Sequence, residues 1–98
     1  MGTRLGTLNA DRAADMKEAI QNFVIQLLLE KGPIPDGIRI EDYRYLDSGH
    51  IDSLAFIKFI FRLEERFKVQ FHPADTGGTE IRTVGGLVRL IEAKQASA

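Results

Sequence analysis

The residue with the clearest chemical potential is Ser53, because it follows Asp52 at the head of an apolar, helix-patterned run. Aspartate is a preferred N-cap, since its carboxylate accepts from free backbone N–H groups of the first helical turn. The pair therefore predicts a helix that begins at Ser53 and presents the serine hydroxyl outward. A helix N-terminus favours a negative group, so a phosphate ester formed on this hydroxyl would be stabilised there.

Residues 53–68 are predicted to form the helix behind Ser53, because their apolar side chains recur every three to four positions without Gly or Pro. The positions expected to face a core are Leu54, Ile57, Ile60 or Phe61, Leu63 and Phe67.

Two catalytic alternatives can be drawn from the same segment. His50, Asp52 and Ser53, with His72 as a second base, would suggest a hydrolase, but the G-x-S-x-G turn is missing and a small bundle offers little room for a cleft. The histidines could also bind a metal with Asp47 and Asp52, yet histidines in unrelated loops are more often ordinary surface residues. We therefore expect neither catalysis nor a metal site.

Composition limits the class of protein. The chain has 98 residues, of which 44% are hydrophobic, and this predicts one globular domain. It has no cysteine, so disulfides and Cys-ligated metals are not expected. No apolar run approaches the roughly 18 to 20 residues that span a bilayer, and the N-terminus lacks a signal-peptide core. With a net charge of -1, nucleic-acid binding is not favoured. A cytoplasmic monomer is expected.

The first helix is predicted to begin at a cap on Asp11 and to stop at Gly32-Pro33. Residues 1–10 are expected to form a flexible tail, residues 11–95 the folded domain, and residues 96–98 a second tail. A connection of about twenty residues leads to Ile51, which is long for a structureless loop in a compact domain. The expected core face of the helix is Met16, Ile20, Phe23, Val24 and Leu27. The expected anchors of the connection are Ile38, Ile40, Tyr43, Tyr45 and Leu46.

The C-terminal third predicts a short element and a last helix. A frayed or 3₁₀ turn is expected at 73–76, because Gly77-Gly78 follows it. Thr83 is expected to cap the last helix, although Gly85-Gly86 in its first turn costs about 1 kcal/mol per residue relative to Ala. Its core face is predicted to be Val84, Leu87, Val88 and Ile91. The fold class is an all-α bundle of three main helices with a short extra helix and a long first loop.

Over residues 11–94 the sequence resembles the acyl and peptidyl carrier proteins. Within that family it resembles a specialised, free-standing carrier. The matching runs are Y-L-D-S-G at 45–49, D-S-L at 52–54, L-E-E-R-F at 63–67, V-Q-F at 69–71 and I-R-T-V at 81–84. Taken alone, the tripeptide D-S-L is common. Joined to the other runs and to the length of the chain, it is a specific signal.

The resemblance implies a carrier rather than an enzyme. Ser53 would carry 4'-phosphopantetheine, transferred from coenzyme A by a phosphopantetheinyl transferase. Asp52 would hold the serine and face that transferase, while Leu54 and Ile51 would pack the motif and form an apolar lip. The cargo would travel as a thioester between loading and transferring enzymes. A helical interaction domain in which Ser53 only begins a helix is the alternative.

The side chains of the second helix suggest how partners are recognised. Lys58, Arg62 and Arg66 recur at i, i+4 and i+8, and we call them the basic stripe. Such a stripe is usually a solvated surface, but here it stands where related fatty-acid carriers are mainly acidic. We expect Ile51, the basic stripe and Glu65 to contact partners, and we expect ordinary fatty-acid enzymes to use the chain poorly. Three phenylalanines also lie on this helix, and they either fill the bundle or line a lipid cleft or partner patch: Phe56, Phe59 and Phe61.

The nature of the cargo stays open at the level of sequence. A fatty acyl, a polyketide or an aminoacyl group attaches by the same thioester. An acyl group, and with it fatty-acid or related lipid biosynthesis, is the leading expectation, and an aminoacyl or peptidyl cargo of a specialised pathway is the alternative.

Overall fold

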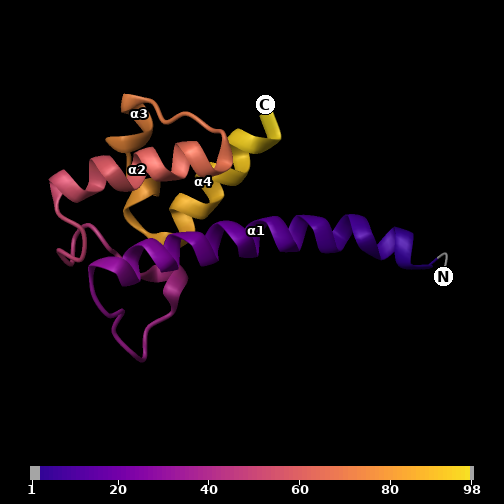
Figure 1. Ribbon diagram of the computed structural model, residues 1–98, viewed down its shortest axis with the longest axis horizontal. Coiled ribbons are helices and arrows are strands. Elements are labelled where there is room, and N and C mark those ends of the chain that lie inside the picture. Colours follow the sequence, from indigo (N-terminus) through magenta and orange to yellow (C-terminus); the bar gives the residue numbers. More distant parts are fainter. Residues whose placement is uncertain (1–2, 98) are drawn as a thin grey trace.

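The computed structural model describes residues 3–97, and it describes the side chains of residues 15–96. Every regular element in this part of the chain is helical, which confirms the predicted fold class (Figure 1). The elements are α1 (Thr3–Lys31), the 3₁₀ turn η1 (Ile40–Asp42), α2 (Ser53–Phe67), α3 (Pro73–Thr76), the 3₁₀ turn η2 (Glu80–Arg82) and α4 (Val84–Ser97). The bundle is formed by α2, α4 and the C-terminal half of α1, whereas the N-terminal half of α1 extends past it (Figure 1).

The beginning of α1 differs from the prediction. The helix begins at Thr3 rather than at a cap on Asp11, because no proline in this segment stops the backbone ladder from continuing. Residues 3–10 of the predicted tail are therefore helical, and so are residues 96 and 97 of the second tail. Residues 1, 2 and 98, the rest of the predicted tails, lie outside the described residues.

The core lies where α1, α2 and α4 meet the long connection. Among the described side chains, the buried apolar ones are Ile20, Val24, Leu27, Leu28, Tyr45, Ile51, Phe59, Leu63, Phe67, Ile81, Val84, Leu87, Val88 and Ile91. This confirms the predicted face of α4 completely. On α1 it confirms Ile20, Val24 and Leu27. Phe23 is half-buried against the core, and Met16 is wrong as a core residue because it is 49% exposed.

The predicted core face of α2 is half wrong. Leu63 and Phe67 are buried as expected, but Leu54 and Ile57 are exposed, and Phe59 takes the expected place of Ile57. Helix α2 carries apolar residues on more than one side, so its own periodicity does not decide which side is buried. Packing decides it, because the ring of Phe59 lies 5.3 Å from the ring of the buried Tyr45.

The long connection between α1 and α2 is anchored mainly by Tyr45. Its side chain is completely buried and its hydroxyl donates to the backbone carbonyl of Ile81 in η2. Burial raises the pKa of the Tyr45 hydroxyl far above its usual range, so the group stays a donor. Among the other predicted anchors, Ile40, Tyr43 and Leu46 are half-buried. Ile38 is wrong as an anchor, because it is exposed in the turn that precedes η1.

Gly85 and Gly86 at the start of α4 lie where a larger residue would collide with neighbouring backbone. Thr83 caps the helix as predicted, since its hydroxyl accepts from the Gly86 backbone N–H at 3.0 Å. A Cβ atom on Gly85 would lie 2.9 Å from the Glu41 carbonyl oxygen, and one on Gly86 would overlap the Glu80 carbonyl oxygen. The two glycines lower the helix propensity, but because they have no Cβ atom, η1 and η2 can approach the backbone of α4 closely.

The short element at 73–76 is α-helical rather than 3₁₀, and it is tied to α4. The Asp75 carboxylate accepts from the His72 backbone N–H at 2.8 Å and lies 2.7 Å from the Lys94 ammonium. The hydrogen bond from Lys94, followed by that from the His72 backbone, lowers the pKa of the Asp75 carboxyl. A single turn of helix is thus held in place from outside.

Candidate functional site

Ser53 is the first residue of α2 and is exposed, as the sequence predicts. Asp52 is in the extended conformation that precedes a helix, and its carboxylate accepts from the Ala55 backbone N–H at 2.8 Å. The predicted N-cap is therefore confirmed. The Asp52 side chain caps the helix, and Ser53 is the first residue after this cap. The exposed Ser53 hydroxyl therefore lies at the positive end of the α2 dipole.

The chain enters this site through a sharp bend. Gly49 has a φ of 80°, which favours glycine, and Ile51 then inserts its side chain into the core with 2% of it exposed. The Ile51 backbone N–H donates to the Tyr45 carbonyl at 3.2 Å. Ile51 therefore packs the motif onto the bundle as expected. Its expected contact with partners is not supported, since its side chain is not accessible.

His50 is engaged on both ring nitrogens, and neither contact is to Ser53. Nδ1 lies 2.7 Å from the Tyr43 hydroxyl, and Nε2 lies 2.7 Å from the carbonyl oxygen of Leu28 near the end of α1. A hydrolase would need one of these nitrogens on the serine. Within the described residues, no group of three or more His, Cys, Asp or Glu side chains could hold a metal ion.

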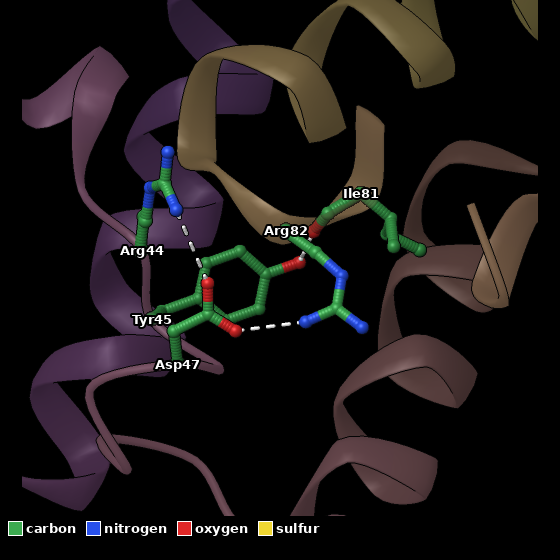
Figure 2. Close-up of polar contacts among 5 residues, drawn as sticks. All are labelled: Arg44, Tyr45, Asp47, Ile81 and Arg82. Atoms are coloured by element: carbon green, nitrogen blue, oxygen red, sulfur yellow. Dashed lines mark hydrogen bonds and ion pairs between the residues drawn. The ribbon is translucent and has the colours of Figure 1, made fainter. Parts of the chain in front are cut away.

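A second polar cluster ties the long connection to η2 (Figure 2). The Asp47 carboxylate lies 2.8 Å from the Arg82 guanidinium and 3.6 Å from that of Arg44, beside the Tyr45 contact to Ile81 (Figure 2). Asp47 belongs to a run that carries the family resemblance, but its partner Arg82 is far away in sequence. Sequence reasoning missed this cluster, and it also missed the Tyr43–His50 pair.

The side of α2 that turns away from α1 is apolar. Leu54, Ile57 and Phe61 are 74%, 66% and 73% exposed, and we call them the outer apolar face. A groove of about 370 Å³ lies along it, and its wall includes one residue of α3. The residues lining this groove are Phe56, Ile57, Ile60, Phe61, Glu64 and Thr76.

The three phenylalanines of α2 divide between the two expected roles. Phe59 is in the core and Phe56 stacks on it, with ring centroids 6.2 Å apart. Phe61 is exposed at the groove. The helix therefore uses its aromatic residues for both packing and surface.

The basic stripe faces α1 rather than open solvent alone. The Arg62 guanidinium lies 2.7 Å from the Glu30 carboxylate of α1, and the Arg66 guanidinium lies 5.8 Å from the centre of the Phe23 ring. Lys58 lines a small cavity of about 120 Å³ between the two helices. These side chains are exposed, and Arg62 and Arg66 also bridge α2 to α1, while the expected contact of the basic stripe with partners stays a prediction.

The two acidic residues of α2 also differ from each other. Glu64 accepts from the Phe71 backbone N–H at 2.9 Å and so holds the chain after α2. Glu65, the one expected to contact partners, is exposed. It lies at the edge of a further hollow with Phe61 and Glu64.

Comparison with known proteins agrees with this geometry. Residues 24–91 match the family model described as the phosphopantetheine attachment site. The D-alanyl carrier protein of Streptococcus suis (strain 05ZYH33) is 29% identical over 83 residues, covering 81% of this chain and 99% of that protein. No solved structure matches the chain significantly.

A small helical bundle with a capped, exposed serine at the head of α2, inside the matched region, is the arrangement expected of a carrier domain. The chain belongs to the phosphopantetheine-binding carrier protein family, whose members hold covalently attached 4'-phosphopantetheine. The described residues fit this group, because the exposed Ser53 hydroxyl lies at a helix N-terminus where a phosphate is favoured. None of the helices described is both long and apolar enough to cross a membrane.

Proposed function

We propose that Ser53 carries the 4'-phosphopantetheine arm and that the protein moves a biosynthetic intermediate between enzymes without catalysing a reaction itself. The observation that carries this proposal is the exposed Ser53 at the first position of α2, capped by Asp52 and inside the matched region. In this proposal the protein acts as a monomer in the cytoplasm, with coenzyme A as the donor.

The roles of the chain's own residues follow from the site. The Ser53 oxygen bonds to the β-phosphorus of coenzyme A as the P–O bond to the α-phosphate breaks. Adenosine 3',5'-bisphosphate is the leaving group, and a base of the transferase takes the serine proton. Asp52 fixes the first turn through Ala55, and the positive end of the helix stabilises the charge of the resulting phosphodiester. The arm supplies the thiol that binds cargo as a thioester. This is necessary because the chain has no cysteine.

Two classes of cargo have support. The likeness to a protein named as a D-alanyl carrier favours a small aminoacyl group, and we take this as the first candidate. The apolar groove along α2 favours an acyl group, as in fatty-acid or related lipid biosynthesis, and this is the second. Both classes would be loaded and released by dedicated enzymes.

We propose that these partners, the transferase included, dock along α2 on the outer apolar face. This face begins beside Ser53 with Leu54, so an enzyme that reaches the serine covers it. Lys58, near the serine end, and Glu65, at the far end, form its charged rim. Arg62 and Arg66 contribute less, because they are engaged with α1. Apolar anchors with a polar rim are typical of binding surfaces.

The test is an intact-mass measurement after incubation with coenzyme A and a broad-specificity transferase. The proposal predicts a gain of one phosphopantetheine unit. A folded protein that gains nothing would contradict it and would favour a helical interaction domain. Loading the modified protein with a panel of aminoacyl and fatty acyl donors, each with its own loading enzyme, then separates the two cargo classes.

A further inference from the structure

We infer that His50 and Tyr43 are positioning residues for group transfer at Ser53. This inference rests on the proposed function, because it assigns roles at the same site. His50 stands two residues before the Asp52 cap, and its ring is half-buried against the end of α1. Its ring nitrogens contact Tyr43 and Leu28, so it acts through the loop and not on the reacting atoms.

The hydrogen bonds define one tautomer of His50. The Leu28 carbonyl can only accept, so the Nε2 atom that lies 2.7 Å from it carries the proton. In the neutral ring Nδ1 is then an acceptor, and the Tyr43 hydroxyl at 2.7 Å donates to it. Each nitrogen therefore has a partner of the opposite kind, which fixes the orientation of the ring.

The pair also connects the ends of helices. The Leu28 carbonyl lies in the last turn of α1, where it also accepts from the Gly32 backbone N–H at 3.2 Å, so His50 is a second donor to this oxygen. The Tyr43 backbone carbonyl accepts from the N–H of Val84, the first residue of α4, at 3.2 Å. His50 and Tyr43 thus join the end of α1 to the start of α4, and the segment that leads to Ser53 and α2 leaves from this junction.

Only a short segment separates the junction from the serine. Ile51 is fixed by its buried side chain and by its N–H bond to Tyr45, and Asp52 is fixed by its bond to Ala55. Releasing the His50 ring leaves these contacts in place but frees the loop on its α1 side. We expect Ser53 to stay accessible while it samples more orientations, and misplacing a reacting group by a small distance lowers rates strongly.

The experiment compares the transferase kinetics of the parent, His50→Phe, Tyr43→Phe and the double variant with coenzyme A as donor. His72→Phe is the matched control, because this other histidine lies at the exposed start of α3. We expect kcat to fall about tenfold in each single variant, with KM for the carrier unchanged because the outer apolar face is intact. The double variant should be no worse than His50→Phe, because His50→Phe already removes the bond to the Tyr43 hydroxyl that Tyr43→Phe removes. His72→Phe should match the parent.

A purely structural role predicts a different outcome. Loss of stability alone would lower the folded fraction and leave the kcat of folded protein unchanged, so rates are measured where circular dichroism shows full folding. His50→Gln keeps an amide donor for the Leu28 carbonyl and should recover part of the lost kcat. NMR of the imidazole nitrogens should report the Nε2–H tautomer in the parent.

Several results would overturn the inference. These are an Nδ1–H tautomer, additive losses in the double variant, or a kcat of His50→Phe equal to that of the parent. If His50→Phe does not fold, Tyr43→Phe, which removes a single hydroxyl, decides the question by the same kcat criterion. If the parent itself is not modified, it is the proposed function that fails, and the two failures are thereby distinguished.

Discussion

The two sides of α2 differ in which kind of side chain packs against the rest of the protein and which is left exposed. The side toward α1 carries the basic stripe. There Arg62 forms an ion pair with Glu30, and Arg66 lies over the ring of Phe23. The side toward α3 carries Leu54, Ile57 and Phe61, and these are exposed. Charged residues thus help to join helices, whereas apolar residues form open surface. The surface left for partners is apolar with a charged rim, and its composition is not evident from counting charges along the helix.

The largest expected effect is a difference in stability between alanine variants of Phe59 and Phe61, which are close in sequence but lie on different sides of α2. Phe59→Ala removes a buried ring and should lower the free energy of unfolding by about 3–5 kcal/mol. Phe61→Ala removes an exposed ring and should change it by less than about 0.5 kcal/mol. Urea denaturation of both variants measures this, and similar losses would mean that Phe61 also belongs to the core.

The second effect concerns docking. Phe61→Glu places a charge in the outer apolar face and should raise the KM of the transferase or loading enzyme for the carrier about tenfold or more. Arg66→Gln, on the other side of the same helix, is the matched control and should change KM less than twofold, about the effect expected at a binding rim. An equal rise in both variants would contradict the division of α2 into two sides.

How much the sequence predicts depends on whether a feature is local. The caps at Asp52 and Thr83 and the core face of α4 are set by neighbouring residues, and they are as predicted. The buried side of α2 depends on the helices around it, since Leu54 and Phe59 are equally apolar candidates. The contact of Asp47 with Arg82 joins distant segments that only the fold brings together.

The glycines of α4 show a related limit. Sequence alone registers Gly85 and Gly86 as a cost in helix propensity, because the chain that approaches them is not visible there. The candidate site divides in the same way. The capped serine is readable from adjacent residues, whereas the support from Tyr43 and Leu28 requires the positions of α1 and α4.

A smaller effect is expected at the contact of α2 with α1. Arg62 and Glu30 are about half-exposed, so their ion pair should contribute only about 0.2–1 kcal/mol. A double-mutant cycle with Arg62→Ala and Glu30→Ala measures this coupling free energy, and added salt should reduce it. A coupling of zero would mean that the basic stripe is an ordinary solvated surface after all.

The smallest expected effect is the pH dependence of stability that comes from Asp75, the residue that holds α3 at the wall of the groove. The pKa of Asp75 is lowered by Lys94 and the His72 backbone, so its contribution to stability is present above the unfolded value of about 4 and is lost as pH falls through the folded value. Between about pH 5 and pH 2 the parent should therefore lose more stability than Asp75→Asn. Thermal unfolding of both proteins across this range measures the difference, and parallel curves would contradict the assignment.

The most direct test of the central claim uses two exposed serines that lie close together in sequence, Ser48 and Ser53. The parent, Ser48→Ala and Ser53→Ala are incubated with coenzyme A and transferase, and their intact masses are measured. If Ser53 is the attachment point, the parent and Ser48→Ala gain one phosphopantetheine unit and Ser53→Ala gains none while remaining folded. Modification of Ser53→Ala as efficient as that of the parent would contradict the account.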